Sequence, residues 1–125
     1  MIKFRKKVLI VDDDPVMVHY AQKMLRMDGY DVVTAKNETE FRKAVESEHP
    51  SLIILDIMLG DKNGPLLYNE MLGKEIKRST PIIFLSALAS DQTPVAAGPG
   101  RSYALRGKPF DSDELVREIN QMLEG

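Results

Sequence analysis

The chain has 125 residues, a length that suits one domain with a core of its own. Hydrophobic residues make up 43% and charged residues 29%, which excludes a disordered chain, and the net charge of −2 gives no bulk attraction to nucleic acid or to an anionic membrane. Cysteine is absent, which excludes disulfides, thiolate metal sites and a cysteine nucleophile.

The N-terminal sequence is not typical of a targeting segment. It is basic, but its apolar run covers only residues 8–11 before Asp12, Asp13 and Asp14 interrupt it. A signal peptide needs a longer apolar stretch. No window approaches the roughly 20 apolar residues of a membrane-spanning helix. We therefore expect a cytoplasmic protein with no membrane insertion.

Short apolar runs alternate along the chain with amphipathic stretches. Several runs are continuous, as in strands that helices cover on both faces. Strands are expected at residues 7–12, 31–35, 51–56, 81–86 and 103–107. Helical spacing of apolar residues predicts helices at residues 15–28, 38–47, 64–78 and 112–124. This alternation predicts an α/β fold with a parallel sheet.

The segment at residues 89–102 is the poorest helix candidate of the chain. It contains Pro94, Gly98, Pro99 and Gly100, which all disfavour a helix interior. A right-handed crossover nevertheless has to return the chain to the sheet here. We expect a short or broken fourth helix, at most over residues 90–97.

Polar side chains lie at the ends of four predicted strands. Asp12 and Asp13 end the first of them and Asp56 ends the third. Ser86 ends the fourth strand, and Lys108 follows the fifth. The carboxyl ends of parallel strands meet at one edge of a sheet, where ligands bind. We therefore expect three carboxylates, a hydroxyl and an ammonium group to converge on one small site.

The expected acidic group points to a cation and to phosphoryl chemistry. Clustered carboxylates repel one another and stay ionised together when a cation lies among them. Oxygen ligands without Cys or His favour Mg²⁺, with Mn²⁺ as the alternative. A cation beside a lysine and a hydroxyl forms a clamp for a phosphoryl group. Asp56 is then a candidate phosphoryl acceptor.

With these residues in place, the chain resembles the receiver domains of two-component response regulators, in the manner of single-domain chemotaxis regulators. The resemblance spans residues 1–125. The matching motifs are VLIVDDDP at residues 8–15, LIILDIML at 52–59, PIIFLSA at 81–87 and KPF at 108–110. It implies a doubly wound, flavodoxin-like fold with strand order 2-1-3-4-5 and helices on both faces.

The resemblance further implies a signalling domain rather than an enzyme acting on other molecules. A histidine kinase or a phosphotransfer protein would phosphorylate it reversibly. Phosphorylation would then switch a surface that binds a downstream protein. Neither direct nucleic-acid binding nor membrane insertion is expected.

Site roles also follow from the resemblance. Asp56 would be the phosphoacceptor, and the metal would be held by Asp13 directly and by Asp12 through a water. The backbone carbonyl of Met58 would be a further metal ligand, together with Asp56. Leu88 and Met58 occupy the two variable positions beside the acceptor. Neither side chain can orient an attacking water, so slow self-dephosphorylation is expected.

The switch residues depart from the family pattern. Ser86 and Lys108 would contact phosphoryl oxygens in the active state. The switch aromatic of the family lies three residues before the lysine, where this chain has Leu105. Tyr103 lies two residues earlier, in the same alternation phase. The coupling of Ser86 to an aromatic side chain is therefore expected to be altered or missing.

Three other interpretations fit parts of the pattern. A metal-dependent phosphatase with an Asp nucleophile needs an acid two residues after the acceptor, where Met58 stands. A nucleotide or flavin module needs a glycine-rich first turn, where residues 12–15 are DDDP. A pseudo-receiver, which binds proteins without being phosphorylated, stays open because the fourth-helix region is unusual.

Overall fold

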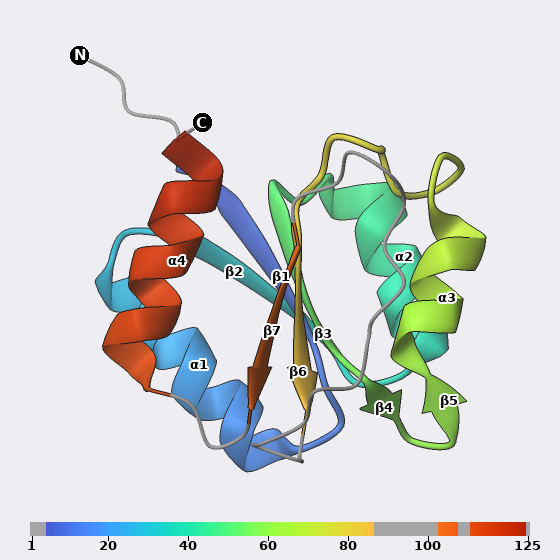
Figure 1. Cartoon of the computed structure of the whole chain (residues 1–125), viewed down its shortest axis with the longest axis horizontal. Coiled ribbons are helices and arrows are strands. Elements are labelled where there is room, and N and C mark those ends of the chain that lie inside the picture. Colours follow the sequence, from blue (N-terminus) through green and yellow to red (C-terminus); the bar gives the residue numbers. More distant parts are fainter. Residues whose placement is uncertain (1–4, 87–102, 108–110, 125) are drawn as a thin grey trace.

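The computed structural model describes residues 5–86, 103–107 and 111–124. A parallel five-stranded sheet lies at its centre, in the order β2-β1-β3-β6-β7 (Figure 1). Its strands are β1 (Lys7–Val11), β2 (Asp31–Ala35), β3 (Leu52–Asp56), β6 (Ile82–Ser86) and β7 (Tyr103–Gly107). Counted within the sheet, this order is 2-1-3-4-5, so the predicted topology is confirmed.

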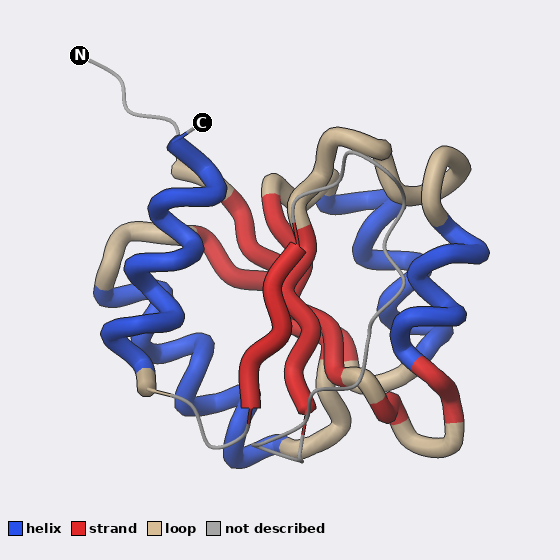
Figure 2. Tube along the Cα trace, in the orientation of Figure 1, coloured by secondary structure: helices blue, strands red, loops and turns tan. Residues whose placement is uncertain are grey.

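Helices cover both faces of the sheet (Figure 2). They are α1 (Pro15–Met27), α2 (Glu38–Glu48), α3 (Gly64–Met71) and α4 (Ser112–Glu124). Helices α1 and α4 lie on one face, and α2 and α3 lie on the other (Figure 1). The predicted doubly wound α/β arrangement is therefore confirmed.

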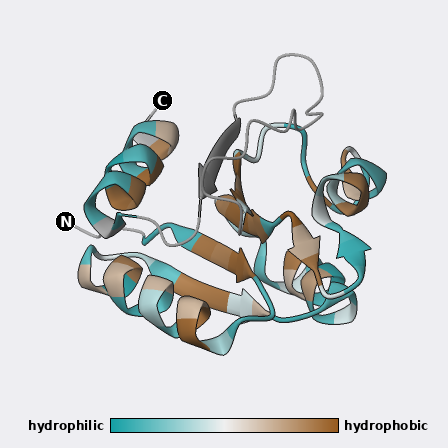
Figure 3. Cartoon of the chain, turned by 60° about the horizontal axis from the view of Figure 1, so that its bottom comes forward, coloured by the Kyte–Doolittle hydropathy of each residue, from teal (hydrophilic) through white to brown (hydrophobic). Residues whose placement is uncertain are grey.

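Two apolar cores lie between the sheet and its two helix layers. Strand β1 contributes side chains to both cores, because successive side chains of a strand point to opposite faces of the sheet. Leu9 and Val11 belong to the core under α2 and α3, and Val8 and Ile10 belong to the core under α1 and α4. Strands β1, β3 and β6 are buried at all but one position, as expected for strands covered on both faces, and hydrophobic residues predominate along the central strands that Figure 3 colours.

Polar side chains define the starts of the helices. Asp14 caps α1 by accepting hydrogen bonds from the backbone N–H groups of Val16 and Met17. Asn37 and Asn63 cap α2 and α3 in the same way. These caps satisfy N–H groups that have no partner inside a helix.

Two local features differ from the sequence-based expectation. Helix α3 ends at Met71, not at residue 78, because Leu72 takes an extended conformation and Gly73 has φ +80°. The chain then turns back so that Leu72 pairs with Ile76 as an isolated bridge. A small hairpin of β4 (Met58–Leu59) and β5 (Lys62–Asn63), which the sequence pattern did not predict, precedes α3.

The short or broken helix expected within residues 90–97 lies outside the described residues. Among the described parts of the chain, no helix is both long enough and apolar enough to cross a membrane.

Candidate functional site

The acidic residues singled out in the sequence lie at one edge of the sheet. Asp12 and Asp13 come directly after β1, and Asp56 is the last residue of β3. Ser86 is the last residue of β6, the neighbour of β3 in the sheet. In the register, Asp56 pairs with Leu85, so Ser86 lies at the same strand edge. These strands run toward the lower part of Figure 1.

The three carboxylates are close enough to share one cation. Asp12, Asp13 and Asp56 each offer an oxygen, and these oxygens all lie within 4.8 Å of one another. Asp12 and Asp56 are 1% and 5% exposed, whereas Asp13 is exposed to solvent. The cluster therefore lies where the strands end near the protein surface. Two of its carboxylates are buried and one is exposed to solvent.

Backbone amides orient each of these carboxylates. The N–H of Asp14 donates to Asp12 Oδ1 at 2.9 Å, and the N–H of Met58 donates to Asp56 Oδ1 at 3.2 Å. The N–H of Gly60, in the turn of the β4–β5 hairpin, donates to Asp13 Oδ2 at 3.1 Å. Three backbone amides thus hold the carboxylates in fixed poses.

The donor set fits a hard divalent cation. Three carboxylates at this separation repel one another, and burial of two of them increases the cost of their charge. A cation among them offsets both costs. Mg²⁺ and similar ions take oxygen ligands, often one or two carboxylates completed by waters.

The start of α3 lies directly against the end of β3. A Cβ built on Gly64 would lie 2.1 Å from the backbone oxygen of Asp56, so only glycine fits there. The N–H of Gly64 donates to the backbone oxygen of Ile57 at 2.6 Å. The position of α3 and the position of Asp56 are therefore coupled through backbone contact.

An open groove leads away from the cluster between α1 and the β2–α2 connection. Its volume is about 580 Å³, and Asp12 and Asp13 lie at one end of it. Pro15 and His19 of α1 line one side, and Lys36 lies on the other. The groove therefore gives access to Asp12 and Asp13 from this side.

Of the remaining predicted site residues, the structure places the side chain of Met58 but not those of Tyr103, Leu105 and Lys108. Met58 lies at the site, because its amide contacts Asp56, and its side chain is 54% exposed. Tyr103 and Leu105 lie on β7, paired with Ile82 and Phe84 of β6, and their side chains are outside what is described. Lys108 lies outside the described residues altogether.

Sequence reasoning missed two features of this region. One is the Gly60 amide on Asp13, for which the only signal is a glycine in a turn four residues after Asp56. The other is a set of ion pairs around Arg42, between α2, the hairpin and α3. Only its Glu38–Arg42 pair, at helical i,i+4 spacing, is visible in the sequence.

A family model for the response regulator receiver domain matches residues 8–120. The chain belongs to this family. Curated relatives of this receiver include the transcriptional regulatory protein KdpE of Staphylococcus aureus, 35% identical over 92% of this chain and 48% of that protein. The alkaline phosphatase synthesis transcriptional regulatory protein PhoP of Bacillus subtilis is 32% identical over 94% of this chain and 48% of its own length.

The receiver thus spans about half the length of these relatives, or less. Two solved receiver domains match it over nearly their whole length. The receiver domain of Francisella response regulator 1452 gives a TM-score of 0.81 at 27% identity, covering 96% of this chain and 98% of that one. The signal receiver domain of an HD domain-containing protein from Pseudomonas fluorescens gives 0.83 at 26% identity, covering 97% and 96%.

Family membership favours the receiver interpretation among those that the sequence left open. The chain is a signalling receiver of two-component systems, and its relatives are response regulators. The flavodoxin-like receiver fold is confirmed by the same structural neighbours. The comparisons favour neither the phosphatase nor the pseudo-receiver interpretation.

Proposed function

We propose that residues 1–125 act as one receiver domain in which Asp56 accepts a phosphoryl group from a phosphohistidine. The donor is a histidine kinase or a phosphotransfer protein of the cytoplasm. The observation that carries this proposal is the convergence of Asp12, Asp13 and Asp56, whose oxygens lie within 4.8 Å of one another at the strand edge.

The transfer follows from the position of Asp56. One carboxylate oxygen attacks the phosphorus, an acyl phosphate bond forms, and the phosphorus–nitrogen bond to the donor imidazole breaks with its electron pair left on nitrogen. The N–H of Met58 fixes the carboxylate plane during the attack. The open groove beside Asp12 and Asp13 gives the donor room to approach.

Asp12, Asp13, Asp56 and the backbone carbonyl of Met58 would hold Mg²⁺, or Mn²⁺ in its place. The bound cation neutralises negative charge that gathers on the transferring group. The resemblance assigns direct ligation to Asp13, which is exposed, and contact through a water to Asp12, which is buried.

Ser86 and Lys108 complete the proposal as contacts of the phosphoryl oxygens. Ser86 is 4% exposed at the end of β6, beside the strand that carries Asp56. Together with Tyr103 and Leu105 of β7, Ser86 would transmit phosphorylation to a surface that binds a downstream protein. The relatives are named transcriptional regulators. The absence of direct nucleic-acid binding by this chain stays a prediction.

Intact-mass spectrometry after incubation with a small-molecule phosphodonor tests the proposal. We expect one phosphoryl adduct on the wild type that requires Mg²⁺ and is lost in Asp56→Ala. Asp61→Ala, which removes an exposed carboxylate from the nearby hairpin turn, is the matched control and should be phosphorylated normally. A wild type without adduct in saturating Mg²⁺, or an adduct that persists in Asp56→Ala, would refute the assignment.

A further inference from the structure

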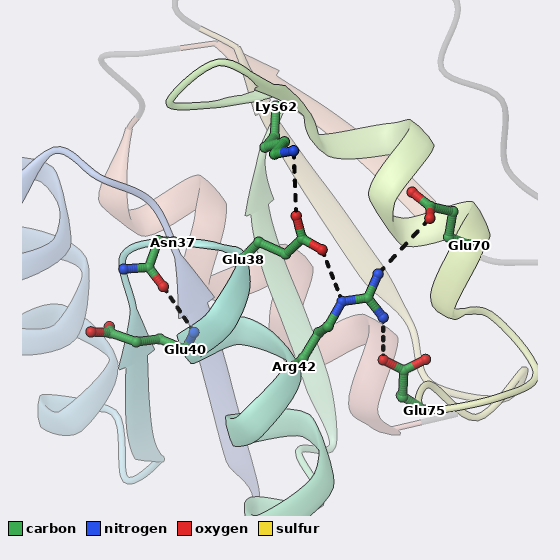
Figure 4. A network of polar contacts seen from close by, with 7 residues as sticks. All are labelled: Asn37, Glu38, Glu40, Arg42, Lys62, Glu70 and Glu75. Carbon is green, nitrogen blue, oxygen red and sulfur yellow. Dashed lines mark hydrogen bonds and ion pairs between the residues drawn. The ribbon is translucent and has the colours of Figure 1, made fainter.

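A group of five charged side chains joins α2 to the β4–β5 hairpin, to α3 and to the turn after α3. We call it the Arg42 cluster. It consists of Glu38, Arg42, Lys62, Glu70 and Glu75 (Figure 4). Two members come from α2, one from β5, one from α3 and one from the turn after α3. Elements far apart in the sequence therefore meet through these ion pairs.

Arg42 is the centre of this cluster. Its Nε donates to Glu38 Oε2 at 3.0 Å, and its Nη1 donates to Glu75 Oε2. Its Nη2 lies 4.0 Å from Glu70 Oε1. The hydrogen bonds to Glu38 and Glu75 raise the pKa of Arg42, so the guanidinium is charged at every working pH.

Glu38 is fixed from two directions. Its backbone lies in the first turn of α2, which Asn37 caps through the N–H of Glu40. Its side chain is held by Arg42, which leaves Glu38 Oε1 facing Lys62 Nζ at 3.8 Å. The carboxylate therefore has a fixed position from which it can anchor the lysine of the hairpin.

Lys62 belongs to the hairpin that contacts the acidic site. It pairs directly with Leu59, the neighbour of both Met58 and Gly60. The amides of Met58 and Gly60 are the groups that donate to Asp56 and Asp13. A hairpin of two residue pairs is not stable alone and takes its position from what surrounds it. The buried Leu59 side chain and the Gly64 amide anchor one side of it.

We propose that Lys62 and Glu38 are positioning residues of the acidic site. The ion pair between them, held in place by Arg42, fixes the outer side of the β4–β5 hairpin against α2. It thereby keeps the amide of Gly60 on Asp13 and the backbone of Met58 beside Asp56. The functional consequence of this inference rests on the proposed phosphoacceptor function. The placement of the hairpin itself can be tested without a cation.

The direction in which the Mg²⁺ affinity changes in Lys62→Met distinguishes a positioning role of Lys62 from the direct effect of its charge. Removing the positive charge of Lys62 lowers the repulsion that a cation meets at the nearby carboxylates, which alone would tighten Mg²⁺ binding. Losing the hairpin anchor has the opposite effect, because the ligand oxygens lose their fixed poses. A weaker Mg²⁺ affinity in Lys62→Met therefore cannot come from the lost charge itself.

The experiment compares the wild type with Lys62→Met, Lys62→Arg and Lys43→Met. Methionine keeps most of the side-chain length, arginine keeps the charge, and Lys43 is an exposed lysine of α2 outside the cluster. Titration calorimetry gives the Mg²⁺ dissociation constant. Amide hydrogen exchange, followed by NMR without Mg²⁺, gives the protection of the Gly60 N–H.

We expect Lys62→Met to weaken Mg²⁺ binding and Gly60 protection by about two- to fivefold, the range of a single exposed ion pair. Lys62→Arg and Lys43→Met should both keep the Mg²⁺ affinity and the Gly60 protection of the wild type. Glu38→Gln should reproduce the loss of Gly60 protection seen in Lys62→Met, and the double variant should lose no further protection.

An unchanged or tighter Mg²⁺ affinity in Lys62→Met, with Gly60 protection as in the wild type, overturns the inference while the proposed function stands. A wild type that binds no Mg²⁺ refutes the proposed cation site instead. In that case the Gly60 exchange rates still decide the inference, because loss of protection in Lys62→Met supports the anchor and equal protection contradicts it.

Discussion

Gly64 packs the start of α3 directly against the backbone of Asp56 in the acidic site. Its missing side chain lets α3 begin against the backbone oxygen of Asp56, where a Cβ would lie at 2.1 Å. Gly64→Ala has to displace α3 or the end of β3, and overpacking of this kind costs about 1–3 kcal/mol. We expect urea unfolding to show this loss, and phosphoryl uptake to fall because Asp56 moves with the strand end.

Gly29→Ala is the matched control for that prediction. Gly29 has φ +94°, and a Cβ added to it would meet no atom within 4 Å, so the cost of the substitution comes from backbone conformation alone. That cost is about 1–3 kcal/mol, and phosphoryl uptake should stay unchanged. The crowding argument fails if the two variants phosphorylate equally well.

We predict that the Met58 side chain lengthens the lifetime of a phosphoryl group on Asp56. Its side chain is 54% exposed and offers a water only a weakly accepting thioether sulfur and no donor. We expect slow self-dephosphorylation of the wild type and about a tenfold increase in Met58→Asn, a modest share of what a positioned polar group can contribute. The loss of the adduct is followed by intact mass after the phosphodonor is removed.

Leu66→Asn adds the same polar group on α3, where the side chain is 63% exposed, and should leave the rate unchanged. A wild-type half-life of seconds would contradict this account of Met58, as would equal rates for all three proteins.

At the scale of elements, α4 is joined to the α1–β2 connection by a short polar chain. The Tyr30 hydroxyl donates to Asn120 Oδ1, and Asn120 Nδ2 donates to Asp28 Oδ2 at 3.3 Å. Tyr30 is 9% exposed, so Asn120→Ala takes a hydrogen-bond acceptor from a nearly buried hydroxyl. Such losses cost about 1–3 kcal/mol.

Urea unfolding should show this cost for Asn120→Ala, whereas Gln121→Ala, at an exposed position of α4, should stay within about 0.5 kcal/mol of the wild type. Tyr30→Phe combined with Asn120→Ala should cost less than the sum of the two single variants, since each removes one partner of the same bond. Additive effects would show that the bond does not connect the two elements.

The same scale shows what the sequence could predict and what it could not. Continuous apolar runs placed β1, β3 and β6, because burial on both faces leaves a clear pattern. The positions of β2 and β7 were also predicted, although β2 has only a short apolar run and is partly exposed. The end of α3 was misplaced because Ile76 continues an apolar spacing that looks helical. In the structure Ile76 reaches the same core through a turn at Gly73. The spacing of apolar residues predicts which side chains are buried, but it does not predict the backbone conformation that brings them into the core.

The candidate site was predictable to the extent that it depends on strand ends. Asp12, Asp13 and Asp56 meet because parallel strands place their carboxyl ends at one edge. The Arg42 cluster was not predictable, because residues 38, 62 and 75 are brought together by packing of different elements. A chain with 29% charged residues offers too many alternative pairings for the right ones to be chosen without the structure.

At the scale of the whole molecule, we predict that the acidic edge makes the free energy of unfolding depend on a bound cation. Without Mg²⁺ the three carboxylates repel one another within 4.8 Å, which costs about 1 kcal/mol per pair even in water-like surroundings. Asp13→Asn relieves part of this repulsion and keeps an oxygen that can accept from the Gly60 amide. In EDTA we therefore expect Asp13→Asn to be more stable than the wild type by about 1 kcal/mol.

Saturating Mg²⁺ should reverse that order. A ligand at about 100 times its dissociation constant stabilises the folded state by about 2.7 kcal/mol, and the wild type should gain this while Asp13→Asn gains much less. Urea unfolding in EDTA and in Mg²⁺, with NaCl at matched ionic strength and Asp61→Asn as the control, measures both orders. The reversal is the decisive observation, because a purely structural role of Asp13 would make Asp13→Asn the less stable protein under both conditions.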